Sequence, residues 1–136
     1  MNSKKTSMSS IVLDSSAALA MLLGESGGER VMQAFLGQED LIAMSAVNWS
    51  DILNRLQRKS SFVSPQSLAA MLPGVEIVPF GQVEAEQTAE LAKSCGALSL
   101  GDRACLSLAN SRGVAAWTTD KVWAQMPVGA KIEMLR

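Results

Sequence analysis

The sequence IVLDSSAALAMLL, residues 11–23, leads from a buried strand into a helix, and this transition decides the class of fold. Residues 11–13 are a continuous apolar run, which is typical of a strand covered on both faces. Asp14 ends the run, the two serines after it favour the start of a helix, and Gly24 closes the stretch that follows. A buried strand followed at once by a helix predicts the first unit of a parallel α/β sheet.

The same alternation of short strands and helices continues along the chain. Further strands are expected at 41–44, 75–79, 114–119 and 131–135, and helices at 28–36, 46–59, 65–72, 82–94 and 99–112. The apolar positions of the helix at 82–94, expected to face the core, are Val83, Ala85, Ala89, Leu91 and Ala92. The pattern predicts one three-layer α/β domain over 11–136, with a mostly parallel central sheet flanked by helices. Residues 1–10, rich in Ser and Lys, are expected to form a loose tail.

The composition restricts the chemistry that this chain can perform. Hydrophobic residues make up 48% of the 136 residues and charged residues 18%, a balance that excludes intrinsic disorder. There is no histidine, which excludes Ser-His-Asp and Cys-His catalysis and histidine-ligated zinc or haem. With 12 Lys and Arg against 13 Asp and Glu, the formal net charge is -1, so any contact with nucleic acid must be local. Hydrolytic chemistry would therefore depend on carboxylates, together with a metal ion.

The cysteines and the first apolar segment indicate the compartment. Cys95 and Cys105 are too few for a disulfide framework or a four-cysteine zinc site, and their apolar surroundings predict small buried side chains. The apolar run at 11–23 is too short to span a membrane, and the carboxylate of Asp14 interrupts it. We expect a soluble, cytoplasmic protein with no membrane partner.

Four carboxylates stand at positions that suggest a common site. Asp14 and Asp120 each end a predicted strand, and Asp102 lies in the first turn of the helix at 99–112. Ligands bind beyond the carboxyl ends of parallel strands, so these acids should border one crevice, and Asp51 on a neighbouring helix adds a fourth. Close carboxylates repel each other unless a cation neutralises them, and an all-oxygen cluster favours Mg²⁺ or Mn²⁺. Taken singly, the first three could instead be helix caps or turn residues, and Asp51 a solvated helix position.

Four segments of the chain resemble the PIN domain in order and spacing, and more narrowly the VapC-type toxins of bacterial toxin–antitoxin pairs. They are IVLDSSAA at 11–18, SAVNWSDIL at 45–53, LSLGDRACLSLA at 98–109 and AWTTDKVW at 116–123. The resemblance covers nearly the whole chain, and the last two segments are its most specific motifs. It implies a metal-dependent nuclease of α/β fold that cleaves structured RNA, chiefly transfer or ribosomal RNA, and is neutralised by a cognate antitoxin.

The resemblance also implies roles for individual residues. The acidic quartet of the family falls on Asp14, Asp51, Asp102 and Asp120, with Asn48 and Thr118 as supporting residues. The implied ligands of Mg²⁺ or Mn²⁺ are Asp14, Asp102 and Asp120, whereas Asp51 would orient or deprotonate the attacking water. Asp51 replaces the family's usual Glu and is one methylene shorter, which could place its carboxylate short of that water.

The sequence defines the binding partners less closely than the acidic site. Arg55, Arg58 and Lys59 on one predicted helix, together with Arg103, form either a solvated surface or a rim that positions RNA phosphates. The apolar excess of the early helices suggests a homodimer, as is common in VapC-type proteins. One alternative is a PIN-like module that binds RNA but has lost catalysis at Asp51. A phosphatase that forms an aspartyl-phosphate on Asp14, or a receiver-type signalling domain, is a further and less favoured alternative.

Overall fold

The computed structural model describes residues 10–59 and 63–136, and a five-stranded sheet forms its centre. The strands are β1 (Ile11–Leu13), β2 (Ile42–Ser45), β3 (Glu76–Val78), β4 (Ala115–Thr118) and β5 (Ile132–Met134). They lie in the order β3-β2-β1-β4-β5, and every neighbouring pair is parallel. The predicted α/β fold is confirmed, and the sheet is wholly rather than mostly parallel.

The order of the strands creates a switch point beside β1. The chain runs outward from β1 through β2 to β3, and then returns to the other side of β1 for β4 and β5. Leu13 pairs with Trp117, so β1 and β4 end next to each other. In open parallel sheets, ligands bind at such a point, beyond the carboxyl ends of the strands. The topology alone therefore brings together the residues that follow β1 and β4.

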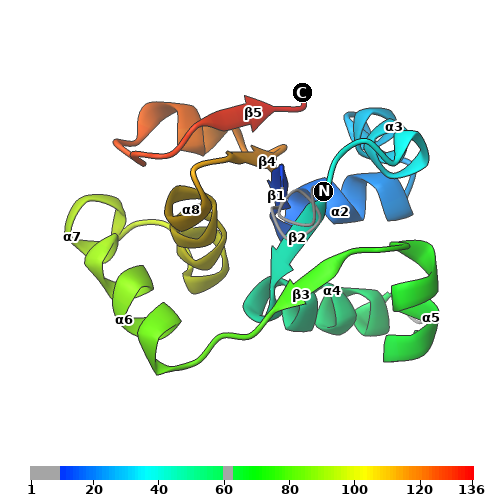
Figure 1. Ribbon diagram of the computed structural model, residues 1–136, viewed down its shortest axis with the longest axis horizontal. Coiled ribbons are helices and arrows are strands. Elements are labelled where there is room, and N and C mark those ends of the chain that lie inside the picture. Colours follow the sequence, from blue (N-terminus) through cyan, green and yellow to red (C-terminus); the bar gives the residue numbers. More distant parts are fainter. Residues whose placement is uncertain (1–9, 60–62) are drawn as a thin grey trace, which may run out of the picture.

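Helices cover both faces of the sheet. One face carries α2 (Ser15–Leu22), α3 (Gly28–Gly37), α4 (Ala46–Arg58) and α5 (Pro65–Met71), and the other carries α6 (Gln82–Glu90), α7 (Ala92–Cys95) and α8 (Leu100–Arg112). Figure 1 shows the sheet running through the middle from β5 to β3, with the first group at the right and the second at the left. The three predicted layers are present.

Successive side chains of β1 enter different cores, as expected for a strand buried on both faces. Ile11 and Leu13 pack with helices α2 to α5, whereas Val12 packs in the cluster of α8 on the opposite face. Val12 and Leu13 are fully buried, and the burial of each aliphatic side chain of this size contributes about 1.5–3 kcal/mol. The apolar run thus fixes the strand that positions Asp14.

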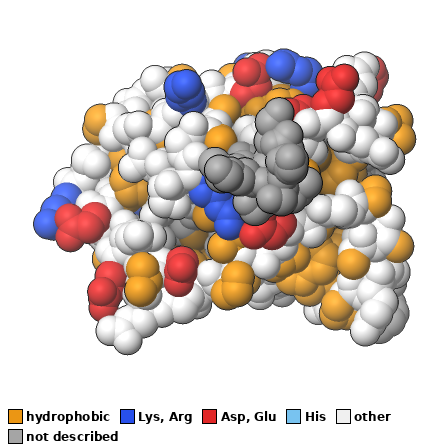
Figure 2. All heavy atoms as spheres, in the orientation of Figure 1, with side chains coloured by type: hydrophobic (Ala, Val, Ile, Leu, Met, Phe, Trp, Pro, Cys, Tyr) orange, Lys and Arg blue, Asp and Glu red, His pale blue; other side chains and the backbone are white. Residues whose placement is uncertain are grey.

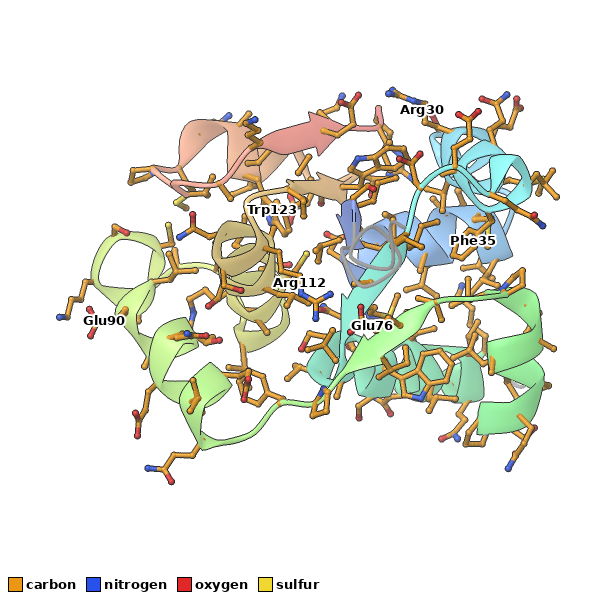
Figure 3. The ribbon with its side chains drawn as sticks, in the orientation of Figure 1. Arg30, Phe35, Glu76, Glu90, Arg112 and Trp123 are labelled. Atoms are coloured by element: carbon orange, nitrogen blue, oxygen red, sulfur yellow. The ribbon has the colours of Figure 1, made fainter. Side chains whose placement is uncertain are left out.

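An ion pair joins the far end of α8 to the edge of the sheet. The guanidinium of Arg112 donates to both carboxylate oxygens of Glu76 on β3, over 2.7 and 3.0 Å. Figure 3 shows these two side chains pointing toward one another. The contact lowers the pKa of Glu76, chiefly through its hydrogen bond with Arg112.

The prediction for residues 82–94 is wrong in two respects. The segment is two helices, α6 and α7, because at Leu91 the backbone N–H turns to the carbonyl of Thr88, a tighter turn than that of an α-helix. The expected apolar face is also wrong, since Val83 is 61% exposed and Ala85 and Ala89 are exposed. The buried residue of α6 is Thr88, since the helix packs on α8 through that side.

One short element was not predicted at all. Residues Lys121–Gln125 form a 3-10 helix, η1, which carries the fully buried Trp123 into the core beside α8. Figure 3 shows Trp123 between this segment and α8. The sequence pattern of a single helical turn is too short to give a periodic signal.

The remaining predictions concern the cysteines, the tail and the membrane. Cys95 and Cys105 are both free and buried, as predicted. The expected tail lies outside the described residues except for Ser10, whose backbone N–H donates to the carbonyl of Leu41 over 2.7 Å. Within residues 10–59 and 63–136, no helix is both long and apolar enough to cross a membrane.

Candidate active site

Asp14 is the most constrained carboxylate of the switch point. It follows β1, is 2% exposed, and caps α2 by accepting the backbone N–H of Ala17 at 2.7 Å. The hydroxyl of Thr118 donates to its Oδ2 over 2.6 Å, and the hydroxyl of Ser16 lies 2.8 and 2.9 Å from its two oxygens. Asp14 therefore serves as a helix cap and also holds a fixed carboxylate at the end of β1.

Burial decides the protonation of this carboxylate. Desolvation raises the pKa of Asp14 from 3.8 to about 6, although hydrogen bonds from Thr118, Ala17 and Ser16 oppose the increase. The negative charge of Asp102 raises this pKa a little further. A buried acid with a raised pKa beside a second acid is a common feature of functional sites.

Hydroxyl groups tie the end of β4 to Asp14. The Thr118 hydroxyl, which donates to Asp14, also accepts the backbone N–H of Asp120 at 2.9 Å. The Ser16 hydroxyl accepts the backbone N–H of Thr119 at 3.0 Å. Asp120 itself caps η1, since its Oδ1 accepts the N–H of Val122 at 3.1 Å. The two strand ends thus have a fixed relation to each other.

The start of α8 is held in the same place by α4. Ser99 caps α8 by accepting the backbone N–H of Asp102 at 3.1 Å, as the sequence motif predicted. The amide of Asn48, which is 1% exposed, donates to the hydroxyl of Ser15 at 3.0 Å and to the carbonyl of Gly101 at 3.1 Å. Asn48 therefore links α2, α4 and α8 beneath the site.

A single cleft of about 520 Å³ opens above these contacts, and all four predicted acids line it. Its lining is made up of Asp14, Ser15, Ser16, Asp51, Arg55, Ser99, Gly101, Asp102, Thr119, Asp120, Lys121 and Arg136. Asn48 and Thr118 are buried and do not line the cleft, but each bonds to a residue that does. Of the four basic residues predicted as a rim, only Arg55 belongs to this lining.

The other predicted basic residues lie elsewhere. Arg103 donates through Nε to the carbonyl of Leu98 at 3.3 Å, and Arg58 is exposed near the end of α4. Sequence reasoning missed Ser16, Lys121 and Arg136 as members of the cleft. A hydroxyl two residues after Asp14 and a cation next to Asp120 were local signals, but nothing local marks Arg136.

The carboxylates differ in electrostatic environment. The pKa of Asp102 is raised, chiefly because the side chain is half-buried, and the charge of Asp120 adds to the increase, while hydrogen bonds with Ser99 oppose it. Asp51 instead lies 3.4 Å from the guanidinium of Arg55, one helical turn further along α4. Both partners of that pair are partly exposed, so it contributes little to stability.

The donor set suits a hydrated divalent cation rather than a closed cage. In the described part of the chain, no three Asp, Glu or Cys side chains lie close enough together to hold a metal ion. Mg²⁺ usually takes one or two protein carboxylates and keeps several waters, so a wide cleft that offers only carboxylate and hydroxyl oxygens as ligands fits this ion. Asp14, Asp102 and Asp120 line the cleft and could hold such an ion, some of them through its bound waters. The charge of Asp102 raises the pKa of Asp14, and the charge of Asp120 raises the pKa of Asp102.

Because burial raises the pKa of Asp14, the ionised carboxylate should destabilise the fold at neutral pH. The pKa of this carboxyl group is 3.8 in the unfolded chain and about 6 in the folded protein. The stability of the fold is therefore highest below pH 3.8, where the group is protonated in both states, and it falls as the pH rises through about 6 and the buried group ionises. Asp14→Asn should therefore raise the free energy of unfolding at about pH 7 by about 1–3 kcal/mol in metal-free buffer. At about pH 4 the gain should vanish. Urea unfolding in EDTA measures both values, and equal destabilisation at both pH values would contradict the assignment.

The fold and the cleft together define a class: an all-parallel α/β domain with an acidic cleft at its topological switch point. The sequence matches the PIN domain family over residues 11–129, and the chain belongs to that family. PIN domains are nucleases and generally depend on a metal. No protein of curated function matches the sequence significantly.

Solved structures of similar fold include VapC toxins and toxin–antitoxin complexes. A toxin–antitoxin complex from Klebsiella pneumoniae has 18% identity and a TM-score of 0.71, covering 93% of this chain and 98% of that chain. VapBC2 from Rickettsia felis, bound to a promoter DNA fragment, has 14% identity, a TM-score of 0.73 and the same coverage. The sarcin-ricin loop cleaving toxin VapC20 of Mycobacterium tuberculosis has 16% identity and a TM-score of 0.68, covering 85% and 94%. The predicted PIN family is confirmed, and at these identities the likeness to VapC toxins is one of fold.

Proposed function

We propose that the protein is a Mg²⁺- or Mn²⁺-dependent endoribonuclease that acts on structured RNA in the cytoplasm as the toxin of a toxin–antitoxin pair. The observation that carries the proposal is the cleft at the switch point, which four carboxylates line and in which three hydrogen-bonding groups fix Asp14. Family membership supports the nuclease activity, and a neighbour of similar fold cleaves ribosomal RNA.

The chain's own residues have distinct tasks in this proposal. Asp14, Asp102 and Asp120 would hold the metal ion, which when bound stabilises negative charge on the phosphate and activates water. Thr118 and Ser16 keep the Asp14 carboxylate in one orientation. Asp51, at the side of the cleft, orients or deprotonates the attacking water. The proposed cleavage does not use a side chain as nucleophile. Burial raises the pKa of the nearby Cys105 thiol, so this group stays protonated and unreactive.

Metal dependence is the first test of this proposal. Because the pKa values of Asp14 and Asp102 are raised, metal binding should displace protons and raise the melting temperature. Calorimetry with MgCl₂ or MnCl₂ in two buffers of different ionisation enthalpy should give different heats, and purified structured RNA should be cut only with metal present. Identical heats, no stabilisation and cleavage in EDTA would together reject the metal site.

An antitoxin is the expected partner, since related folds were solved as toxin–antitoxin complexes. We expect its blocking segment to order on binding and to offer Arg or Lys to Asp14, Asp102 and Asp120. Co-expression with the product of the neighbouring reading frame should yield a stable complex in which RNA cleavage is suppressed. Full cleavage by the purified complex would contradict this part of the proposal.

A homodimer is also proposed, because large apolar side chains are exposed on the side of the molecule that α3 and α5 form. They are Met32, Leu36, Leu41 and Met71, and Figure 2 shows apolar side chains at the surface on this side. Exposed apolar groups that lie together commonly mark an interface.

A second candidate function is an RNA-binding module without catalysis. The ion pair of Asp51 with Arg55 favours it, since the pair gives this short carboxylate a structural partner in place of a catalytic one. RNA binding with no metal-stimulated cleavage would establish this candidate.

A further inference from the structure

A second hollow opens beside the acidic cleft and continues it. It has a volume of about 290 Å³ and shares Ser16, Arg55, Thr119 and Arg136 with the cleft. Its other lining residues are Leu19, Leu23, Glu25 and Lys59. Because four residues line both spaces, the two form one path along α2 and α4. The second hollow is called here the basic groove.

Charge is divided unequally along this path. The charged lining of the acidic cleft consists of four carboxylates (Asp14, Asp51, Asp102 and Asp120) and three cations (Arg55, Lys121 and Arg136). That of the basic groove consists of three cations (Arg55, Lys59 and Arg136) and one carboxylate (Glu25). Arg55 and Lys59 are one helical turn apart on α4, so they lie on the same side of that helix. A ligand in this path would pass from a lining with an excess of carboxylates to one with an excess of cations.

Two of the three cations of the groove, Arg55 and Arg136, take part in partly exposed ion pairs. Arg136 is fixed by donating through Nε to the carbonyl of Ser26 at 2.9 Å, and its Nη2 lies 3.5 Å from Glu25. Arg55 lies 3.4 Å from Asp51. The ammonium group of Lys59 makes no hydrogen bond or ion pair with any residue that the structure describes. A lysine that has no ion-pair partner among the described residues, beside two guanidinium groups, can bind a phosphate.

We propose that the basic groove binds the RNA backbone directly next to the phosphodiester that lies in the acidic cleft. The inference rests on the proposed nuclease function and adds the place and form of the substrate. The carboxylates by themselves repel RNA, and Lys59, Arg55 and Arg136 offset this repulsion at the neighbouring phosphate. Leu19 and the partly exposed Leu23 offer an apolar floor to a ribose or base.

The size of the groove favours unpaired RNA. A hollow of about 290 Å³ is comparable in volume with a single nucleotide, so it suits an unpaired strand better than a base-paired helix. The segment bound here is therefore unpaired, such as a loop in a folded RNA, where sequence-specific recognition usually takes place.

Removal of the Lys59 charge tests the proposal. The probe is a fluorescein-labelled single-stranded RNA, and the protein carries Asp102→Asn to prevent cleavage during the measurement. Lys59→Ala should lower the dependence of log affinity on log salt by about 0.7, the value for one phosphate contact on a single strand. Lys59→Glu should weaken binding by about tenfold or more. An RNA duplex of the same sequence should bind less tightly and respond less to Lys59→Glu.

Lys93→Ala is the control of matched charge, since Lys93 is an exposed lysine on α7 that pairs with Glu90. It should leave both affinity and salt dependence unchanged. Lys59→Ala and Lys93→Ala should have nearly equal melting temperatures, whereas Lys59→Glu should melt slightly lower, because Lys59 caps the C-terminus of α4 and a negative charge is unfavourable there. In the chain without Asp102→Asn, Lys59→Glu should raise the KM for RNA and change kcat little.

The outcomes separate this inference from the proposed function. If RNA is cleaved but Lys59→Glu behaves as Lys93→Ala does, or if Arg58→Ala weakens binding as much as Lys59→Ala, the groove is not the backbone site. If no RNA is cleaved under any metal but single-stranded RNA binds with the predicted dependence on Lys59, the nuclease proposal fails and the groove stands. Equal binding of single strand and duplex would also overturn the inference.

Discussion

Replacement of Asp102 by Asn is expected to abolish metal-dependent RNA cleavage while the fold remains intact. Asp102 lines the cleft at the start of α8. Its charge raises the pKa of Asp14, and the charge of Asp120 raises the pKa of Asp102. Loss of one negative ligand should weaken metal binding and lower kcat/KM by about a hundredfold or more, which equals about 2.7 kcal/mol in the barrier. Single-turnover cleavage and metal titration by calorimetry measure the two effects.

The fold should tolerate this change for a specific reason. The Ser99 cap uses the backbone N–H of Asp102, and the substitution leaves that bond in place. Removal of a charge whose pKa is raised by burial should leave the melting temperature unchanged or slightly higher in metal-free buffer. Asp40→Asn, at an exposed position outside the cleft, is the matched control and should retain full activity. Cleavage by Asp102→Asn at the rate of this control would remove Asp102 from the site.

Asp51→Glu is expected to increase cleavage by about tenfold, or about 1.4 kcal/mol in the barrier. The added methylene should carry the carboxylate further into the cleft that Asp51 already lines, and restore the reach of the family's usual Glu. The longer side chain can still pair with Arg55 one turn away, so the helix should keep its stability. Initial rates at saturating metal measure the effect.

Asp51→Ala completes this test. It should lower the cleavage rate by about tenfold or more yet retain metal binding, because Asp14, Asp102 and Asp120 remain. Lower activity of Asp51→Glu would show that α4 already suits the shorter acid. Unchanged cleavage by Asp51→Ala would instead leave Asp51 with its ion pair to Arg55 as its only role.

Much of the fold was predictable because its signals are local. The apolar run of β1, the Ser99 cap of α8 and the alternation of strands and helices each depend on residues close together in sequence. The positions of Asp14 and Asp120 after strands are also local signals. Because the strands are parallel, their carboxyl ends lie at the same edge of the sheet. The prediction for 82–94 failed because the few small apolar residues of α6 do not mark one face clearly, and contact with α8 selects the face that carries Thr88.

The sequence by itself determined the α/β class, the acidic residues of the cleft and the kind of chemistry that a chain without histidine can perform. The tertiary structure decided which charges accompany those acids. Arg136 and Lys121 line the acidic cleft, Lys59 lines the groove beside it, and Arg58 and Arg103 line neither. The physical reason is distance along the chain, because hydrophobic periodicity and helix caps act within a few residues. Arg136 and Arg55 line the same spaces only because β5 and α4 pack around one sheet. The raised pKa of Asp14 has the same origin, since burial by distant segments cannot be seen in the residues next to it.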